Sequence, residues 1–282
     1  MSITRRDVLK LASGTAALCA AGLNPLAARA AAGKKIPIAL QLYSLRDVIG
    51  KDVPGTLAAV AQMGYQGVEF AGYCGKTAEQ LRKILDQNGL KCCGTHTGLD
   101  TLLGDRLKAT VELNRTLGNP FLIVPWLDGK KYMGSVEAIQ DTAKLLTELA
   151  EKVKPEGMHV GYHSHGGDFH KIDGQTVWDR LFSSAGPDVV MQLDVGNCLG
   201  GGGDPLAVLK KFPGRCLTIH IKEFGGKPGA TIGEGTVPWK ELFRICETTA
   251  GTQWYIVEQE AYAGPPLDSV KQCLENLRKM GK

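Results

Sequence analysis

Polar residues that can bind a metal ion stand at or just after the ends of four apolar runs in the second half of the chain. The runs have the length and β-rich composition of buried strands. A divalent cation needs three or four nitrogen or oxygen donors aimed at one point, and neighbouring strands of a closed barrel provide that convergence. We therefore predict a metal site at these strand ends. Its candidate ligands are His163 or His165, Asp194, His220 and Glu258.

The rest of the chain supplies the elements that would position these residues. From residue 35 onward, short β-rich runs alternate eight times with longer runs of helical period. The predicted strands are 36–43, 67–70, 91–96, 121–125, 159–163, 189–194, 217–221 and 255–258. The predicted helices are 52–64, 77–89, 106–117, 135–153, 176–183, one beginning at Asp204, 238–248 and 267–280.

Eight strand-then-helix units predict an α/β fold of the (β/α)₈ TIM-barrel type. The alternative is an open, doubly wound sheet. We favour the barrel because no glycine-rich dinucleotide fingerprint follows the first strand, where the sequence reads Gln-Leu-Tyr-Ser-Leu-Arg. No linker or low-complexity tract interrupts the pattern, so residues 31–282 are expected to form one domain.

The first thirty residues resemble a bacterial twin-arginine (Tat) signal peptide. Arg5 and Arg6 precede the apolar stretch 11–23, and the small-residue pattern Ala-Arg-Ala follows at 28–30. The alternative is an amphipathic N-terminal helix. The prediction is therefore a signal at 1–30 and a periplasmic mature protein, exported by the twin-arginine route and without a stable membrane anchor.

Charge and cysteine content restrict the partners. After residue 30, 29 basic and 28 acidic residues remain, so the mature net charge is +1. A nearly neutral domain lacks the basic surface that phosphate-backbone binding requires, and we expect no nucleic-acid partner. Seven widely spread cysteines remain, which we expect to be buried apolar residues with at most one fortuitous pair.

Six short pieces of the sequence resemble the sugar phosphate isomerase/epimerase superfamily, the xylose isomerase-like TIM barrels. The similarity covers essentially all of residues 36–282. The pieces are Leu-Gln-Leu-Tyr-Ser-Leu-Arg at 40–46, Tyr-His-Ser-His at 162–165, Leu-Asp at 193–194, His-Ile-Lys-Glu at 220–223, Gly-Glu-Gly at 233–235 and Val-Glu-Gln at 257–259.

This resemblance implies one divalent ion, Mn²⁺, Co²⁺, Zn²⁺ or Mg²⁺, held by four side chains that are commonly Glu, Asp, His and Glu. The last three correspond to Asp194, His220 and Glu258. At the first position this sequence has a histidine in place of glutamate. We assign His165 to the ligand set and His163 to catalysis, although residues two apart on a strand face the same side and spacing cannot decide between them.

The loss of that glutamate bears on mechanism. In ketose epimerase relatives two glutamates on opposite faces of the substrate exchange protons with its carbon, and here only Glu258 remains. Proton transfer would then be asymmetric, with a histidine such as His163 or His96, or another residue, opposite Glu258; otherwise the reaction would differ from epimerisation. Lys222, two residues past His220, would project to the same side and hold an oxyanion or carboxylate.

Residues near the ends of the first four strands are candidates for substrate binding. Tyr43 and Trp126 offer aromatic faces that suit a sugar ring, and Glu69 offers a carboxylate. For each of them core packing or a rim ion pair is the alternative.

The expected function is a metal-dependent sugar or keto-sugar isomerase or epimerase that removes a proton next to a carbonyl. One alternative is a lyase, hydratase or hydrolase acting on keto-sugars or glycosides through the same ion, and another is a non-catalytic sugar-binding barrel. A DNA-repair endonuclease is disfavoured by charge and export. The expected partner is a small sugar, and a homo-oligomer is compatible with the sequence.

Overall fold

The computed structural model describes residues 35–282. The predicted signal at 1–30 lies outside the described residues. Between residues 35 and 282, no helix combines the length and apolar character needed to cross a bilayer.

Eight parallel strands close into a barrel in the order β1-β10-β9-β8-β5-β4-β3-β2, which confirms the predicted (β/α)₈ fold. The strands are β1 (Ile38–Gln41), β2 (Gly67–Phe70), β3 (Lys91–His96), β4 (Phe121–Val124), β5 (His159–His163), β8 (Val190–Asp194), β9 (Thr218–Ile221) and β10 (Trp254–Val257). A separate antiparallel pair, β6 (Lys171–Ile172) and β7 (Gln175–Thr176), lies between β5 and β8 in sequence.

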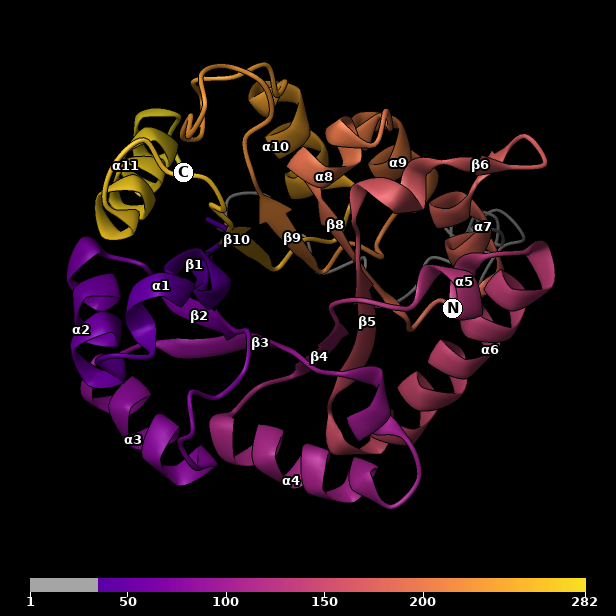
Figure 1. Ribbon diagram of the computed structural model, residues 1–282, viewed down its shortest axis with the longest axis horizontal. Coiled ribbons are helices and arrows are strands. Elements are labelled where there is room, and N and C mark those ends of the chain that lie inside the picture. Colours follow the sequence, from indigo (N-terminus) through magenta and orange to yellow (C-terminus); the bar gives the residue numbers. More distant parts are fainter. Residues whose placement is uncertain (1–34) are drawn as a thin grey trace, which may run out of the picture.

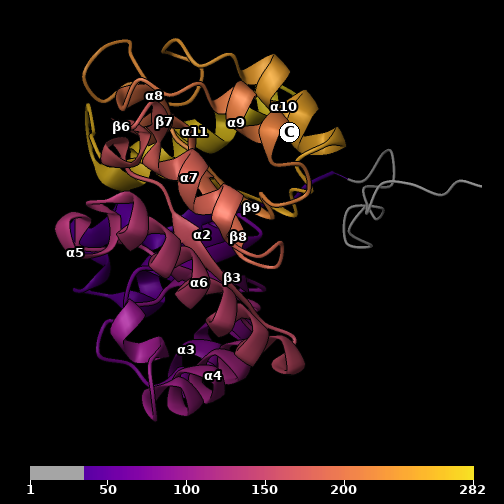
Figure 2. The ribbon, with the colours of Figure 1, turned by 90° about the vertical axis from the view of Figure 1, so that its right-hand side faces the viewer.

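Helices surround the barrel, as Figure 1 shows. The longer ones are α2 (Val53–Met63), α3 (Ala78–Gln87), α4 (Arg106–Leu117), α6 (Val136–Val153), α7 (Val177–Ser184), α9 (Pro205–Lys211), α10 (Trp239–Thr248) and α11 (Pro266–Lys279). Figure 2 shows α3 and α4 at one end of the molecule and α9 and α10 at the other. These eight helices match the eight predicted ones within a few residues.

The predicted caps explain where several of these helices begin. The Thr77 side chain accepts from the backbone N–H of Gln80, and the Gln80 side chain accepts from that of Thr77, a complete capping box for α3. Ser135 caps α6, and Asp204 caps α9 just before a proline at the first helical position.

Short elements at the strand ends were not predicted. The first strand was expected to reach residue 43, but the chain turns into a 3₁₀ helix, η3 (Leu42–Leu45), because the Gln41 side chain accepts from the backbone N–H of Tyr43. The other additions are α1 (Arg46–Ile49), η4 (Leu99–Leu102), α5 (Gly129–Met133), η5 (Lys154–Glu156), η6 (Gly166–Phe169) and α8 (Val195–Gly200).

The barrel interior is apolar toward the amino ends of the strands and polar toward their carboxyl ends. Alternating residues point inward, and those toward the amino ends form two small clusters, one with Phe121, Val190 and Leu217, the other with Ala39, Cys93 and Ile256. Further along three of these strands the next residue in the same alternation is polar, namely Gln41 after Ala39, Gln192 after Val190 and Glu258 after Ile256. Within residues 35–282 all seven cysteines are free thiols, and all but Cys74 are buried, as expected.

Candidate active site

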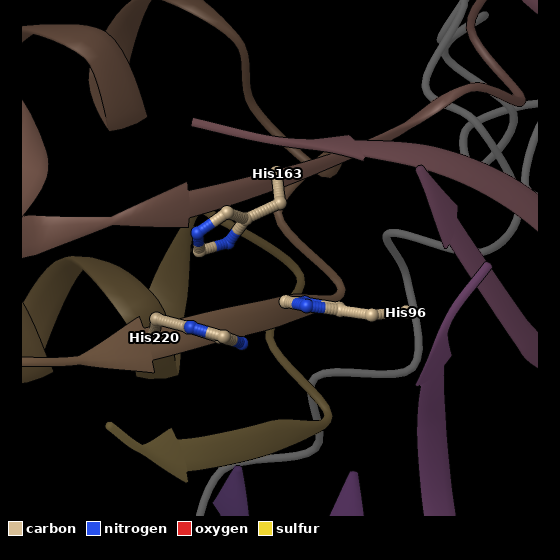
Figure 3. Close-up of side chains that lie close together, drawn as sticks. All are labelled: His96, His163 and His220. Atoms are coloured by element: carbon tan, nitrogen blue, oxygen red, sulfur yellow. The ribbon is translucent and has the colours of Figure 1, made fainter. Parts of the chain in front are cut away.

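Four of the predicted strand-end residues meet inside the carboxyl end of the barrel. His163, Asp194, His220 and Glu258 are all buried, and each offers one ligand atom such that these atoms lie within 4.8 Å of one another. A second group with the same property joins His96 to His163 and His220. Figure 3 shows the three imidazole rings close together, reached from β3, β5 and β9.

Asp194 presents one oxygen to this centre and uses the other to fix its own position. Its Oδ1 accepts from the backbone N–H of Asn197 at 2.6 Å, which caps α8. The Asp194 N–H donates to Oγ of Ser164. Its Oδ2 is buried without a hydrogen-bond partner. A buried carboxylate oxygen without a hydrogen bond fits a metal ligand, because a bound cation would offset the cost of its desolvation.

His220 lies between carboxylates. Its Nδ1 is 3.3 Å from Oε2 of Glu258 and 3.7 Å from Oδ2 of Asp194, while its Nε2 is 2.6 Å from Oε2 of Glu69. Burial alone would lower the pKa of His220, but the charges of Glu69 and Glu258 outweigh burial and raise the pKa well above its usual value. By these distances, Nδ1 is the ring nitrogen that faces Asp194 and Glu258.

Lys222 places a positive charge at the edge of the same group. Its Nζ donates to Oδ1 of Asn197 at 3.0 Å, pairs with Glu260, and lies 3.6 Å from Glu258 and 3.9 Å from Asp194. Burial would raise the pKa of Glu258, but His220 and Lys222 hold that pKa below its ordinary range. Glu258 is therefore held in its ionised form at neutral pH.

The two histidines of β5 and its following loop have different surroundings. His163 belongs to both groups of potential ligands, and burial, followed by the charges of His220 and His96, lowers its pKa well below its usual value. β5 ends at His163, so His165 lies beyond the strand, with its ring edge-on to that of His163 at 5.0 Å. The Nδ1 atom of His165 is buried without a partner. Geometry favours His163 as the ligand, and the assignment of His165 stays a prediction.

The predicted substrate residues fall into two kinds. Tyr43 and Trp126 are exposed aromatics, at 44% and 64% of their surface, near the barrel mouth after β1 and β4. The Tyr43 ring is covered by the Arg46 guanidinium at 4.6 Å. Glu69 is fully buried inside β2, whereas His96 keeps 10% of its side chain exposed beside the cluster.

Two residues that sequence reasoning missed organise this region. Gln192, fully buried in β8, joins Glu69 to His96 and His163 through its amide. Glu223 holds the loop after β9, accepting from the backbone N–H groups of Gly233 and Val237 and from Nε1 of Trp239. Its position directly after Lys222 on a strand end was the available signal.

The donor set fits a divalent cation. Two imidazoles and two carboxylates, buried and drawn from neighbouring strands, match ligand types that Zn²⁺, Mn²⁺ and Co²⁺ accept. These residues could form a metal site.

The chain is similar in sequence to curated proteins of known name. The chain is 25% identical over 274 residues to the rhizopine catabolism protein MocC of Rhizobium meliloti, covering 82% of this chain and 83% of the relative. It is 24% identical over 207 residues to the inosose dehydratase of Geobacillus kaustophilus, covering 62% and 66%. These relatives agree with the expectation of an enzyme, with a lyase as an alternative to an isomerase or epimerase.

Solved structures share the whole barrel. A sugar phosphate isomerase/epimerase from Parabacteroides distasonis superposes with a TM-score of 0.76 at 25% identity, covering 87% of this chain and 98% of the other. The IOLI protein, solved with a bound zinc atom, superposes with a TM-score of 0.65 at 14% identity, covering 86% and 97%. The family model described as "Xylose isomerase-like TIM barrel" matches residues 57–280, and the chain belongs to this family.

Proposed function

We propose that the protein is a divalent-metal-dependent enzyme that removes a proton next to the carbonyl of a sugar ketone or cyclic polyol ketone, leading to isomerisation or epimerisation. The observation that carries this proposal is the convergence of ligand atoms from His163, Asp194, His220 and Glu258 inside the barrel mouth. The resemblance to sugar isomerases and epimerases supports the substrate class.

The ion would be held by His163, Asp194, His220 and Glu258. His165 lies near this group: burial lowers its pKa, and the charge of Asp194 acts in the opposite direction. When bound, a divalent ion acts as a Lewis acid that stabilises negative charge on a carbonyl oxygen. Two imidazoles among the donors favour Zn²⁺, Mn²⁺ or Co²⁺ over Mg²⁺.

The protein's own groups would move the proton. Glu258 is ionised and faces the centre, so it can accept a proton from the substrate carbon. His96, on the other side of His220 with its ring stacked at 5.5 Å, can return a proton from a different direction. Lys222 can donate a hydrogen bond to substrate oxygen that gains negative charge.

Elimination of water is the second candidate, and the position of Lys222 favours it. Glu258 would take the proton from the carbon next to the carbonyl while the bond from the next carbon to its hydroxyl breaks. The Lys222 ammonium, 3.6 Å from Glu258, would give its proton to the departing hydroxide, so that water leaves and a carbon–carbon double bond remains. The relative from Geobacillus kaustophilus, named an inosose dehydratase, points the same way.

One experiment separates these reactions. The metal-loaded protein is incubated in D₂O with a panel of keto-sugars and cyclic polyol ketones, and the mixture is followed by NMR and mass spectrometry. Deuterium at the carbon next to the carbonyl with unchanged composition supports isomerisation or epimerisation, and loss of one water supports elimination. Absence of both, across substrates that bind, would contradict the proposal and favour a sugar-binding barrel.

We also propose that the mature enzyme works in the periplasm. Support comes from the twin-arginine pattern at Arg5 and Arg6 and the small-residue pattern at 28–30.

A further inference from the structure

We propose that Glu69 and Gln192 form a buried positioning layer that sets which ring nitrogens of His163 and His220 face the metal site. This inference rests on the proposed metal-dependent function, since it concerns how that site is prepared. Neither residue belongs to the four potential ligands. Both are fully buried, so they act through their neighbours and not by touching a dissolved substrate.

A backbone group fixes the donor and acceptor direction of the hydrogen bonds in this layer. The N–H of Tyr43 can only donate, and it donates to Oε1 of Gln41 at 3.0 Å. The Gln41 amide is thereby oriented, and its Nε2 donates to Oε2 of Glu69 at 2.7 Å. A carboxylate accepts and an amide nitrogen donates, so the orientation of one side chain determines that of the next.

Glu69 passes this orientation to His220. Its Oε2 lies 2.6 Å from Nε2 of His220, and an ionised carboxylate requires that nitrogen to carry the proton. When a cation binds, Nδ1 of His220, which faces Asp194 and Glu258, is then the nitrogen that loses its proton and supplies a lone pair. A carboxylate that accepts from the outer nitrogen of a ligand histidine is a recurrent support of metal sites.

Gln192 carries the orientation to the other two histidines. Its Nε2 donates to Oε1 of Glu69 at 2.8 Å and to Oγ1 of Thr218 at 3.0 Å. Its Oε1 is therefore the atom 3.1 Å from both Nδ1 of His163 and Nε2 of His96, and these nitrogens must carry protons. The ring nitrogen of His163 without a proton is then Nε2, and we infer that this is the atom that His163 offers to the metal site.

The backbone makes room for the Glu69 carboxylate. The register between β2 and β3 shifts at this point, so that Val68 pairs with Cys92 while Glu69 pairs with Gly94. A Cβ at Gly94 would overlap the carboxylate oxygen Oε1 of Glu69. Glycine at position 94 thus leaves the space that the Glu69 carboxylate occupies.

Wild-type protein gives the first test. Long-range ¹H–¹⁵N correlation spectra of the zinc-loaded protein report which nitrogen of each histidine carries a proton. We expect the proton of His220 on Nε2 and that of His163 on Nδ1. Zinc on Nε2 of His220, or a proton on Nε2 of His163, would overturn the inference without any variant being made.

Two substitutions disturb the layer by different routes. Glu69→Gln replaces one acceptor by an NH₂ donor. That donor must face either Nε2 of Gln192 or the Nε2 atoms of Gln41 and His220, all of which donate to the wild-type carboxylate. Gly94→Ala keeps the carboxylate but displaces it. We expect each to weaken zinc affinity about 10- to 100-fold in competition with a chelator, as loss of such a support generally does.

Matched controls make the result specific. Glu112→Gln removes an exposed carboxylate on α4, and Gly129→Ala adds a methyl where no atom lies within 4 Å, so both should bind zinc as wild type does. If Glu69→Gln and Gly94→Ala bind zinc with wild-type affinity, the inference about the positioning layer is overturned, while the proposed metal site still stands. Zinc binding that Asp194→Ala fails to reduce would instead overturn the proposed metal site, and the inference with it.

Discussion

Oε2 of Glu258 lies 3.3 Å from Nδ1 of His220, although 38 residues separate them in the chain. The contact exists because β9 and β10 are neighbours in register, with Ile256 beside His220, so that the next inward residue after Ile256 reaches over the imidazole. The Lys222 ammonium lies 3.6 Å from the same carboxylate. The proposed base Glu258, the potential metal ligand His220 and a positively charged lysine therefore lie together.

Glu258→Gln tests the role of that carboxylate in proton transfer. The amide keeps the shape but cannot accept the proton, so we expect kcat to fall about 100-fold or more. Deuterium exchange into the substrate should be lost together with product formation. Exchange at the wild-type rate in this variant would assign the base to another residue; Glu112→Gln, on the exposed face of α4, is the control.

Lys222→Met separates chemistry from metal binding. The substitution removes a positive charge beside Asp194 and Glu258, so zinc should bind at least as tightly as in wild type. Because the donor to the substrate oxygen is lost, we expect kcat to fall about 100-fold or more. Weaker zinc binding with unchanged kcat would show that the ammonium supports the site and not the reaction.

Asp168 makes the protein less stable as the pH rises, which is the opposite of the usual effect of a carboxyl group. Burial raises its pKa to about 6, while the His165 N–H and the Tyr162 hydroxyl donate to it. Since the unfolded value is about 3.9, the folded state binds the proton more tightly. The contribution of Asp168 to stability is therefore present below about pH 4 and lost as the pH rises through about 6.

Asp168→Asn should remove this dependence. Between pH 4 and pH 7 the free energy of unfolding of wild type should fall relative to that of the variant by up to about 3 kcal/mol, from a shift of about two pKa units. Denaturant unfolding at both pH values measures the difference. Parallel pH profiles for the two proteins would show that Asp168 is as easily ionised in the fold as in the unfolded chain.

Export is tested by replacing both arginines of the predicted signal. Arg5→Lys combined with Arg6→Lys keeps the charge but removes the twin-arginine pattern, so the full-length precursor should accumulate inside the cell. Fractionation followed by N-terminal sequencing of the periplasmic form of the unaltered protein should place the cleavage after residue 30. Periplasmic accumulation of the double variant at the normal level would contradict the twin-arginine route.

Much of the fold could be predicted because it depends on local patterns. The strands at 67–70, 91–96 and 159–163 match the structure residue for residue, since each is a short β-rich run bounded by turn residues. The end of the first strand was placed too late. There a single side chain, Gln41, bonds the backbone of Tyr43 and ends the strand, which hydrophobicity does not reveal.

The site could be predicted in outline but not in its inner layer. Asp194, His220 and Glu258 converge because strand ends converge in any closed barrel. The contact between Gln192 and Glu69 runs across the interior between β8 and β2, which are not neighbours in the barrel. No sequence spacing encodes such a contact. Spacing also could not separate His163 from His165, because residues two apart on a strand face the same side.

The most direct test of the account is elemental analysis of protein purified without chelators, with wild type, Asp194→Ala and Glu112→Gln compared side by side. We expect about one divalent ion per chain in wild type and in Glu112→Gln, and at least a tenfold lower content in Asp194→Ala, because that change removes a buried ligand oxygen. Equal metal content in wild type and Asp194→Ala would contradict the metal centre on which the proposed reaction depends.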